Sequence, residues 1–507
     1  MRKSVFVLSA LTVLAATLSC NEEEASDSQV TTEQIDVEQT SEEPVNEEPV
    51  TPEEEIIEET TSEHHPSANL ERCYATSINT PESNFCPENV FDDDPNTYWA
   101  TMPGAAPDEG LFFSFEKPVI ISAISIQVLP GSGSIEGIKY YQLYINGLES
   151  PIRRATDEPV PINAWVKSIF IRIDATDSME SQVNGIRYAG NLPVGISEIT
   201  LLVMNGNGDE VPLLVHPIGR TGGHVQASSC LEPMEAYHTD FLFDSRSEFG
   251  WSDGNQTSTG DGENLTFFFD QPQRIEKIKI WNGYQRSQTH FDQNERASVI
   301  SFGADGGNAP KYQLSDTMEP QVITLDTPLE DRSFTMNILE IHEGATYKDL
   351  VISELRFFNG EEWFVLDSGE SQSRKHDILE WAQNTSADAF IDKQVFSSYY
   401  AEQEYFTQTL VLRSNGSFIL WKHREQDGDT EIMYADGNWQ IIDDNAVRIF
   451  GRLHRIGRYS QASYDPYYGV RPGQEPDMDR ITIFNDILEF DGSHISSDRG
   501  MFEDFTF

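Results

Sequence analysis

The sequence predicts an all-β protein in which two tandem β-sandwiches are followed by a small antiparallel β-barrel or sandwich. Runs of alternating apolar residues, each of strand length, recur between clusters of Gly, Asn and Pro from residue 69 to the C-terminus. A stretch of 18 residues returns 152 residues further along the chain. No long amphipathic helix interrupts these runs, and a chain of 507 residues is long enough for about three domains.

The first 20 residues have the layout of a bacterial export signal. Two basic residues precede an apolar run from Val5 to Leu18, which is too short for a stable membrane span. The run ends in "TLSC", which resembles a lipobox of the kind found in lipoproteins of Bacteroidota. This resemblance implies that Cys20 is lipidated and becomes the new N-terminus. Thr17 and Leu18 depart from the usual lipobox residues, so an ordinary signal peptide is the alternative.

Residues 21–68 predict a disordered acidic tether. They carry 17 acidic side chains and no lysine or arginine, so they cannot bury enough apolar surface to fold. The formal net charge of the whole chain is -51, which disfavours a nucleic-acid partner. The stretch "CNEEE" resembles the acidic segment that follows the lipidated cysteine of surface-exposed lipoproteins. It implies an outer-membrane lipoprotein held in the membrane by its lipid and displayed on the cell surface, with the periplasmic face as the alternative.

The two predicted sandwiches, residues 69–222 and 223–368, are repeats of each other. The segments 75–92 and 227–244 align without a gap, and Trp99 and Trp251 match at the same offset. A repeat of this length corresponds to a whole domain.

Both repeats resemble discoidin, or coagulation-factor 5/8 type C, domains, whose fold is a jelly-roll β-sandwich. In the first repeat the resemblance lies in "ENVFDDDPNTYWAT", "FSFEKPVIISAISI" and "GISEI". In the second it lies in "WNGYQRSQTHFDQNER", which is similar to the variant attached to bacterial NAD glycohydrolases as a translocation and glycan-binding module. The resemblance implies glycan binding by the second repeat, whereas the enzyme domain of those proteins has no recognisable counterpart here.

The loop 281–298 of the second repeat is the predicted ligand site. A sugar offers apolar C–H faces and hydroxyl groups, so its site needs aromatic rings and planar amide or guanidinium groups. We expect Tyr284 and Phe291 to supply ring faces and the polar residues to pair with hydroxyls. The alternative is that the rings fix the loop onto the sandwich and the arginines bridge to carboxylates. The predicted ligand-binding residues are Trp281, Asn282, Tyr284, Gln285, Arg286, Phe291, Asn294 and Arg296.

The first repeat lacks the aromatic loop but carries the acidic turn "FDDDPNTYW". Its resemblance to the family implies that Asp92, Asp94, Thr97 and Glu198 surround a structural calcium ion, for which hard oxygen ligands are suited. A solvated acidic turn is the alternative. The second repeat has Arg246 opposite Asp94 and Phe249 opposite Thr97, so calcium is not expected there.

Residues 369–507 open with a short helix, "HDILEWAQNT", and continue as hairpin-linked strands. The arrangement resembles lipocalin-like bacterial domains, and we expect a barrel filled with its own side chains rather than one that holds a ligand. Cys73, Cys86 and Cys230 remain after Cys20, and the sequence does not fix their pairing.

The sequence carries no recognisable catalytic motif, because "IHEGAT" lacks the second histidine of a zinc-protease helix and no nucleophile elbow is present. These observations favour a non-catalytic, membrane-tethered lipoprotein of the bacterial cell envelope that binds a glycan or polysaccharide. The alternative is an envelope assembly component whose β-domains bind a partner protein.

Overall fold

A computed structural model describes the part of the chain that forms β-structure. The signal peptide, Cys20 and residues 21–65 of the predicted tether lie outside the described residues. All described residues belong to one compact unit, Glu63–Phe507. Within them, no helix is long and apolar enough to cross a membrane. The described ranges are 66–79, 84–103, 108–156, 158–177, 186–187, 192–232, 237–255, 260–304, 309–367, 378–401, 404–426, 429–460, 483–491, 494–497 and 505–506.

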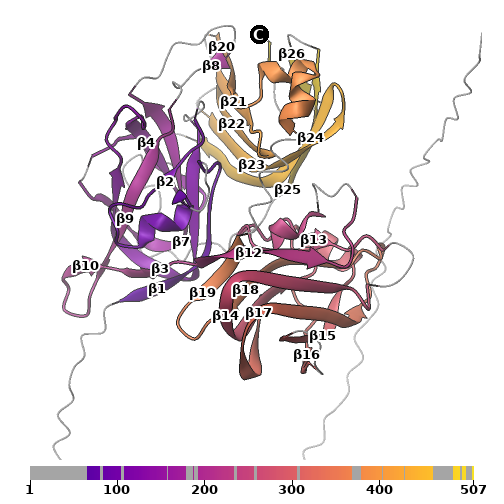
Figure 1. The fold of residues 1–507 in the computed structure, drawn as a ribbon. Coiled ribbons are helices and arrows are strands. Elements are labelled where there is room, and N and C mark those ends of the chain that lie inside the picture. The colour runs from indigo at the N-terminus through magenta and orange to yellow at the C-terminus, as the bar shows by residue number, and fades with distance from the viewer. Residues whose placement is uncertain are drawn as a thin grey trace, which may run out of the picture. The chain divides into compact units, whose positions relative to one another are not determined.

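The first repeat forms a β-sandwich, as predicted, with the strand order β10-β9-β3-β7-β4-β5 and with β1 paired to both β3 and β11. Its core is apolar and contains Trp99, Phe113 and Ile171. Figure 1 shows the long strands of this repeat in indigo to purple. The elements are β1 (Ser67–Ala75), η2 (Pro87–Phe91), β2 (Trp99–Ala100), β3 (Gly110–Val128), β4 (Ile138–Ile145), β5 (Leu148–Glu149), β6 (Arg153–Arg154), β7 (Val160–Thr176), β9 (Gly195–Met204), β10 (Glu210–Pro212) and β11 (Leu214–His216).

The second repeat forms the sheet β13-β18-β19-β12-β14-β17-β15-β16, in which β14 also pairs with β18. Phenylalanine rings fill its core, and those of Phe302 and Phe334 stack with centroids 5.7 Å apart. The elements are β12 (Gly219–Ala227), η3 (Thr239–Leu242), β13 (Trp251–Ser252), β14 (Asn264–Asn282), α2 (Gln288–Gln293), β15 (Arg296–Ala304), β16 (Lys311–Gln313), β17 (Gln321–His342), β18 (Val351–Phe358) and β19 (Trp363–Asp367).

Strand β12 crosses the boundary that the sequence indicates between the two sandwiches. The predicted boundary between residues 222 and 223 falls inside β12, which begins at Gly219. The three glycines of "GRTGGHVQA" indicate a turn by composition. In the sheet, however, Gly223 lies so close to the backbone of Phe268 that a Cβ would be 2.1 Å from the Phe268 carbonyl oxygen. Glycine is therefore required here by the close approach of β14.

Long bent strands are a second difference from the sequence prediction. The sequence predicts two strands, "NLTFFFD" and "RIEKIKIWN", on either side of Pro272, yet both lie in β14. The pairing of β14 with β17 shifts register between Phe268 and Gln273, around Pro272. Proline has no N–H to donate to the ladder, so the strand bends there without ending. In the first repeat, β3 shifts register in the same way around Pro118.

The internal repeat is visible in matching contacts. Trp99 donates its Nε1 hydrogen to the carbonyl oxygen of Ser77 at 3.0 Å, and Trp251 donates to the carbonyl oxygen of Ser229 at 3.0 Å. Both tryptophans are fully buried. The 152-residue offset found in the sequence therefore joins positions that are equivalent in space.

The C-terminal strands form an antiparallel sheet in chain order from β20 to β27, and β20 lies near β27. Figure 1 shows this sheet curving around a short helical segment, whose residues 378–383 lie within the predicted helix. Phe390, Trp439 and Phe490 belong to an apolar core within it. The strands are β20 (Gln394–Ala401), β21 (Glu404–Leu412), β22 (Ser417–Gln426), β23 (Asp429–Asp443), β24 (Ala446–Ser460), β25 (Ile483–Phe490), β26 (His494–Ser497) and β27 (Phe505–Thr506).

One strand of the C-terminal sheet comes from the first repeat. The short strand β8 (Ile186–Arg187) pairs antiparallel with β20 through Val395 and Gln394. The sequence did not predict this pairing, because a two-residue strand has no periodic signal of its own.

Cys73 and Cys86 are free thiols, and the Cys230 thiol donates to the carbonyl oxygen of Tyr237 at 3.2 Å. Burial raises the pKa of Cys86 to about 12, so its thiol is protonated at neutral pH.

Candidate functional site

The loop 281–298 leaves the end of β14, makes one short helix and enters β15. Gly283 has φ +75°, a conformation that glycine adopts without strain. Ser287 then caps α2, because its hydroxyl accepts a hydrogen bond from the backbone N–H of His290 at 3.3 Å. At the other end of the helix, the Asn294 side chain donates to the carbonyl oxygen of His290 at 2.7 Å. Hydrogen bonds at both ends of α2 therefore set the conformation of residues 287–294.

Two of the predicted amides hold the loop to itself. Asn282 is fully buried, and its amide donates to the carbonyl oxygen of Ala297 at 2.7 Å and accepts from the Ala297 N–H at 3.1 Å. Gln285 donates to the carbonyl oxygen of Asn282 at 2.8 Å, and its backbone N–H donates to Ser353. These bonds join the two ends of the loop and connect the loop to β18.

Tyr284 and Arg286 contact each other and neighbouring rings. The Arg286 guanidinium carbon lies 4.7 Å from the centroid of the Tyr284 ring and 4.9 Å from that of Phe450, in the C-terminal sheet. Its Nε donates to the carbonyl oxygen of Glu248 at 3.2 Å. Tyr284 is only 7% exposed, and burial raises its pKa to about 12. Burial followed by the charge of Arg286 lowers the pKa of His290, which packs edge-on to Tyr284.

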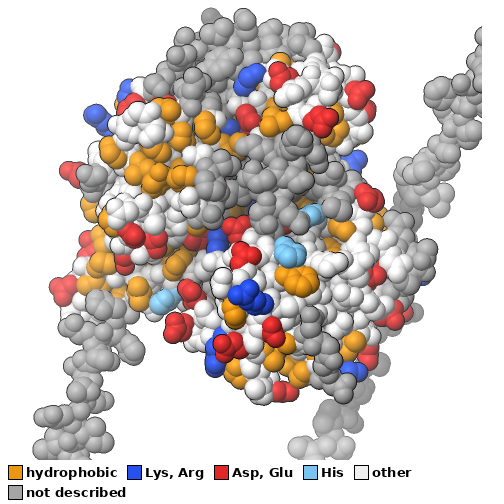
Figure 2. All heavy atoms as spheres, in the orientation of Figure 1, with side chains coloured by type: hydrophobic (Ala, Val, Ile, Leu, Met, Phe, Trp, Pro, Cys, Tyr) orange, Lys and Arg blue, Asp and Glu red, His pale blue; other side chains and the backbone are white. Residues whose placement is uncertain are grey.

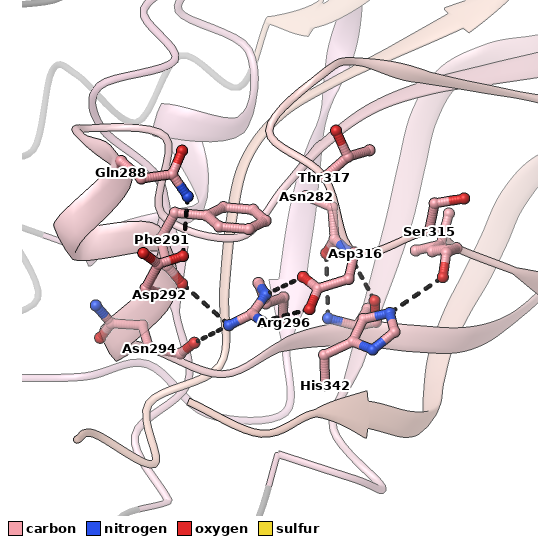
Figure 3. Close-up of polar contacts among 12 residues, drawn as sticks. Asn282, Gln288, Phe291, Asp292, Asn294, Arg296, Ser315, Asp316, Thr317 and His342 are labelled. Carbon is pink, nitrogen blue, oxygen red and sulfur yellow. Dashed lines mark hydrogen bonds and ion pairs between the residues drawn. The ribbon is translucent and has the colours of Figure 1, made fainter. Parts of the chain in front are cut away.

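Arg296 connects the helix to the loop before β17, as Figure 3 shows. Its Nε and Nη2 donate to the two carboxylate oxygens of Asp316 at 2.6 and 2.7 Å. Its Nη1 donates to the carbonyl oxygens of Phe291 and Asn294 at 3.0 and 2.9 Å. The guanidinium carbon also lies 4.6 Å from the centroid of the Phe291 ring, which is 3% exposed. The hydrogen bonds from Arg296 lower the pKa of Asp316.

Trp281 lies on the strand face opposite the core residues Ile278 and Ile280, because successive side chains of a strand point to opposite faces. That face is covered, because the cations of Lys279 and Arg356 lie 5.1 and 4.6 Å from the Trp281 ring centroid. Lys279 Nζ in turn forms an ion pair of 2.6 Å with Glu116 of β3. The Trp281 side chain is consequently only 4% exposed.

The eight predicted residues therefore lie together, but mostly inside the protein. Seven of them are buried, and Arg286 is partly buried. The contacts of Phe291 and Arg296 are those of the alternative interpretation, in which the rings fix the loop and the arginines bridge to carboxylates. Ligand contact by these eight side chains stays a prediction.

The surface of this end of the sandwich is formed by other side chains. The backbone N–H groups of Ala345 and Tyr347 donate to the carbonyl oxygens of Asp292 and Gln293 at 2.9 and 2.8 Å, so the loop after β17 is attached to α2. Tyr347 is 50% exposed. We call the exposed side chains of α2 and this loop the outer face; its residues are Gln288, Thr289, Asp292, Thr346, Tyr347 and Lys348.

Tyr347 is not among the eight residues that the sequence predicts to bind a ligand. The segment "IHEGAT", immediately before it, was considered only as a failed metal motif. The signal that could have identified the loop is its composition, since "HEGATYKD" combines a tyrosine with charged and small residues directly after a long strand.

The residues predicted to hold calcium lie at the turn after η2 and at β9. Thr97 Oγ1 donates to Asp92 at 2.7 Å, and the Asp94 carboxylate accepts hydrogen bonds from Asn96. Burial, followed by the charges of Asp93 and Asp92, raises the pKa of Glu198 to about 7. Among the described residues, no group of three or more His, Cys, Asp or Glu is arranged to hold a metal ion. The calcium site at Asp92, Asp94, Thr97 and Glu198 stays a prediction.

Acidic side chains are spread over the surface, as Figure 2 shows for one face. This distribution agrees with the excess of 85 Asp and Glu over 34 Lys and Arg in the whole chain. A neutral or cationic ligand is electrostatically easier to accommodate on such a surface than an anionic one.

The second repeat matches one family model. Residues 220–358 match the NAD glycohydrolase translocation F5/8 type C domain. This match covers the loop 281–298 and the outer face, and it agrees with the resemblance found in the sequence. No curated protein matches the chain.

Solved structures that match parts of the chain include a glycosyltransferase and carbohydrate-binding modules. The arabinofuranosyltransferase AftD from Mycobacteria is 9% identical to this chain, with a TM-score of 0.24. The match covers 72% of this chain but only 32% of AftD. The CBM32-1 and CBM32-2 domains of Clostridium perfringens ZmpB are 9% identical with a TM-score of 0.22, covering 57% of this chain and 92% of that one. The family 32 CBM of C. perfringens NanJ, solved in complex with galactose, is 13% identical with a TM-score of 0.20, covering 27% and 92%.

Proposed function

We propose that this protein is a non-catalytic, membrane-tethered carbohydrate-binding lipoprotein of the bacterial cell envelope, and that the outer face of its second sandwich receives the glycan. The observation that carries the proposal is the half-exposed ring of Tyr347, which lies on a loop attached to α2 within the F5/8 type C match.

The outer face has the chemistry that a sugar requires. The ring of Tyr347 offers an apolar surface for C–H groups, and its hydroxyl gives it a polar end. Asp292 and Gln288 are exposed on the neighbouring helix and are joined by a hydrogen bond of 2.9 Å. An amide and a carboxylate can respectively donate to and accept from sugar hydroxyls.

The arrangement also explains why the loop 281–298 is rich in aromatic and planar groups. Arg296 binds Asp316 and two loop carbonyl oxygens, and Asn282 bridges the two strands that border the loop. These bonds hold α2 in one orientation, so that the outer face is ordered before a ligand arrives. A preordered surface loses less conformational entropy on binding.

Two tyrosines at the same end of the sandwich provide the test. Tyr347→Ala should weaken glycan binding by about 1–3 kcal/mol, the usual cost of truncating an aromatic anchor, and should leave the thermal midpoint nearly unchanged. Tyr284→Ala removes a ring that is 7% exposed and should lower the free energy of unfolding by about 3 kcal/mol.

The measurements are a glycan array on purified wild-type protein, followed by calorimetry with the sugar that it identifies and thermal melts of both variants. Unchanged affinity in Tyr347→Ala would refute the assignment of the outer face. Binding to no glycan, together with capture of an envelope protein, would favour the assembly function in place of glycan binding.

The tether is tested separately. Because lipidation requires the thiol, Cys20→Ala should move the protein from the membrane fraction to the soluble fraction of the cell. A variant that still sediments with membranes after a high-salt wash would contradict the lipid anchor.

A further inference from the structure

A cavity of about 190 Å³ lies where the first sandwich, the second sandwich and the C-terminal sheet meet. Tyr74 at the end of β1 contributes to it from the first sandwich, and Phe241 and Phe243 contribute from η3 and the turn that follows. Asn415 and Asn438 contribute from the C-terminal sheet. Because all three regions line it, the cavity exists only in the assembled chain and is separate from the outer face.

The two guanidinium groups in its wall are already neutralised. Arg220 donates through Nε and Nη2 to the two oxygens of Glu88, at 3.0 Å each. Arg246 Nη2 lies 3.0 Å from Glu248 and 2.9 Å from the carboxylate of Asp436. A further anion in the cavity would therefore meet no unpaired cation from these two arginines.

Two carboxylates in the wall retain oxygens that can accept. One oxygen of Asp244 accepts from the backbone N–H of Arg246 at 2.8 Å. The other oxygen of Asp244 and both oxygens of Asp367 accept no hydrogen bond from the described residues. Asp244 and Asp367 both line the cavity, and each residue is partly exposed. Asp240, which faces His238 at 3.3 Å, adds a third carboxylate.

We propose that this cavity binds the ammonium group of a small organic amine, with Asp244 and Asp367 as its acceptors and the rings of Tyr74, Phe241 and Phe243 around its carbon skeleton. An ammonium donates three hydrogen bonds and accepts none, which matches a wall with unused carboxylate oxygens. Aromatic rings near a cation add attraction through their electron-rich faces. The site goes beyond the proposed glycan-binding function and does not depend on it.

The same charge balance disfavours other ligand classes. An acidic sugar would place its carboxylate beside Asp240, Asp244 and Asp367, where like charges repel. A neutral sugar of the same size would add no cation to the three carboxylates in the wall, beside which lie Arg220 and Arg246, both already paired to other carboxylates. Burial, followed by the charge of Glu354, raises the pKa of Asp244 well above its ordinary value, and a bound ammonium would oppose that shift.

The experiment is calorimetry on the whole purified chain with D-glucosamine, cadaverine, N-acetyl-D-glucosamine and D-glucuronate at neutral pH. We expect D-glucosamine or cadaverine to bind at least tenfold more tightly than either of the other two. The comparison of the two amines distinguishes an amino sugar from an aliphatic amine as the source of the ammonium. Equal binding of D-glucosamine and its N-acetyl derivative, or no binding of either amine at millimolar concentration, would overturn the proposal.

The variants Asp244→Asn and Asp367→Asn should each weaken amine binding at least tenfold. They lie on different segments, so a folding defect in one leaves the other as a test. Asp270→Asn, at an exposed position of β14, is the matched control and should bind as wild type does. Wild-type affinity in both cavity variants would also overturn the proposal.

Tyr347→Ala separates this site from the glycan site. It should leave amine binding unchanged, and Asp244→Asn should leave glycan binding unchanged. Failure of the amine site with intact glycan binding, or the reverse, can therefore be told apart.

Discussion

The two sandwiches are repeats of each other, but they differ at the turn that follows η2 in the first and η3 in the second. After η2, the first sandwich has Asp92, Asp93 and Asp94, which are exposed to solvent. After η3, the second has Asp244 and, opposite Asp94, the buried Arg246. Each turn faces a glutamate on the corresponding long strand, Glu198 in β9 or Glu354 in β18, and burial is the first cause of the raised pKa of both.

Arg246 gives the turn after η3 contacts that the acidic turn of the first sandwich does not make. Arg246 bonds to Glu248 within its own turn, and its guanidinium carbon lies 4.7 Å from the Tyr74 ring centroid of the first sandwich. It also donates to the carbonyl oxygen of Asp436 at 3.1 Å and to its carboxylate at 2.9 Å, in the C-terminal sheet. Arg246 therefore makes this turn of the second sandwich a point where three parts of the chain meet, whereas the corresponding turn of the first sandwich is exposed and acidic.

The largest expected effect tests this role of Arg246. Arg246→Met should lower the free energy of unfolding by about 3–5 kcal/mol, because it leaves the buried carboxylates of Glu248 and Asp436 without their cation. Urea unfolding of the whole chain measures the change. Arg274→Met is the control, since Arg274 pairs with Glu276 at an exposed position and should change stability by less than about 0.5 kcal/mol. Equal losses of unfolding free energy in the two variants would show that Arg246 does not hold the three parts of the chain together.

An intermediate effect is expected in the loop that only the second sandwich has. Arg296→Met should lower the free energy of unfolding by about 1.5–3 kcal/mol, because it removes charge-assisted hydrogen bonds to Asp316 and to loop carbonyl oxygens. Chemical unfolding detects the change, with Lys311→Met at an exposed position of β16 as control. Wild-type stability combined with lost glycan affinity would instead mean that Arg296 contacts the ligand.

The smallest effect concerns the acidic turn of the first sandwich. The pKa of Glu198 rises from its ordinary value of 4.5 to about 7 on folding, so the folded state holds the proton more tightly. Glu198 therefore destabilises the fold increasingly as pH rises from 4.5 to 7. Glu198→Gln removes this penalty, and its melting temperature should exceed that of wild type at pH 8 but not at pH 4.

Adding calcium to the same melting experiment tests the predicted metal site. If the predicted ion binds at Asp92, Asp94, Thr97 and Glu198, adding calcium at pH 8 should raise the melting temperature of wild type more than that of Glu198→Gln. An identical response of the two proteins, or none in either, would leave the acidic turn as a solvated one and would end the calcium prediction.

The sequence by itself determined the β-architecture and the repeat. Alternating apolar residues indicate which strand face joins the apolar core, and Ile278 and Ile280 lie in that core. The sequence matches Trp99 with Trp251, and in the structure the two residues make equivalent hydrogen bonds. These features depend on residues close in the chain or on period and spacing, which can be read without coordinates.

Only the tertiary structure decided which side chains of the predicted site face solvent. Arg296 is covered because Asp316, 20 residues away, accepts its hydrogen bonds, and Arg286 lies against Phe450 of another sheet. Tyr284 and Tyr347 are chemically identical, yet they are 7% and 50% exposed. Exposure depends on what distant segments cover, and neither the composition of a loop nor its periodicity contains that information.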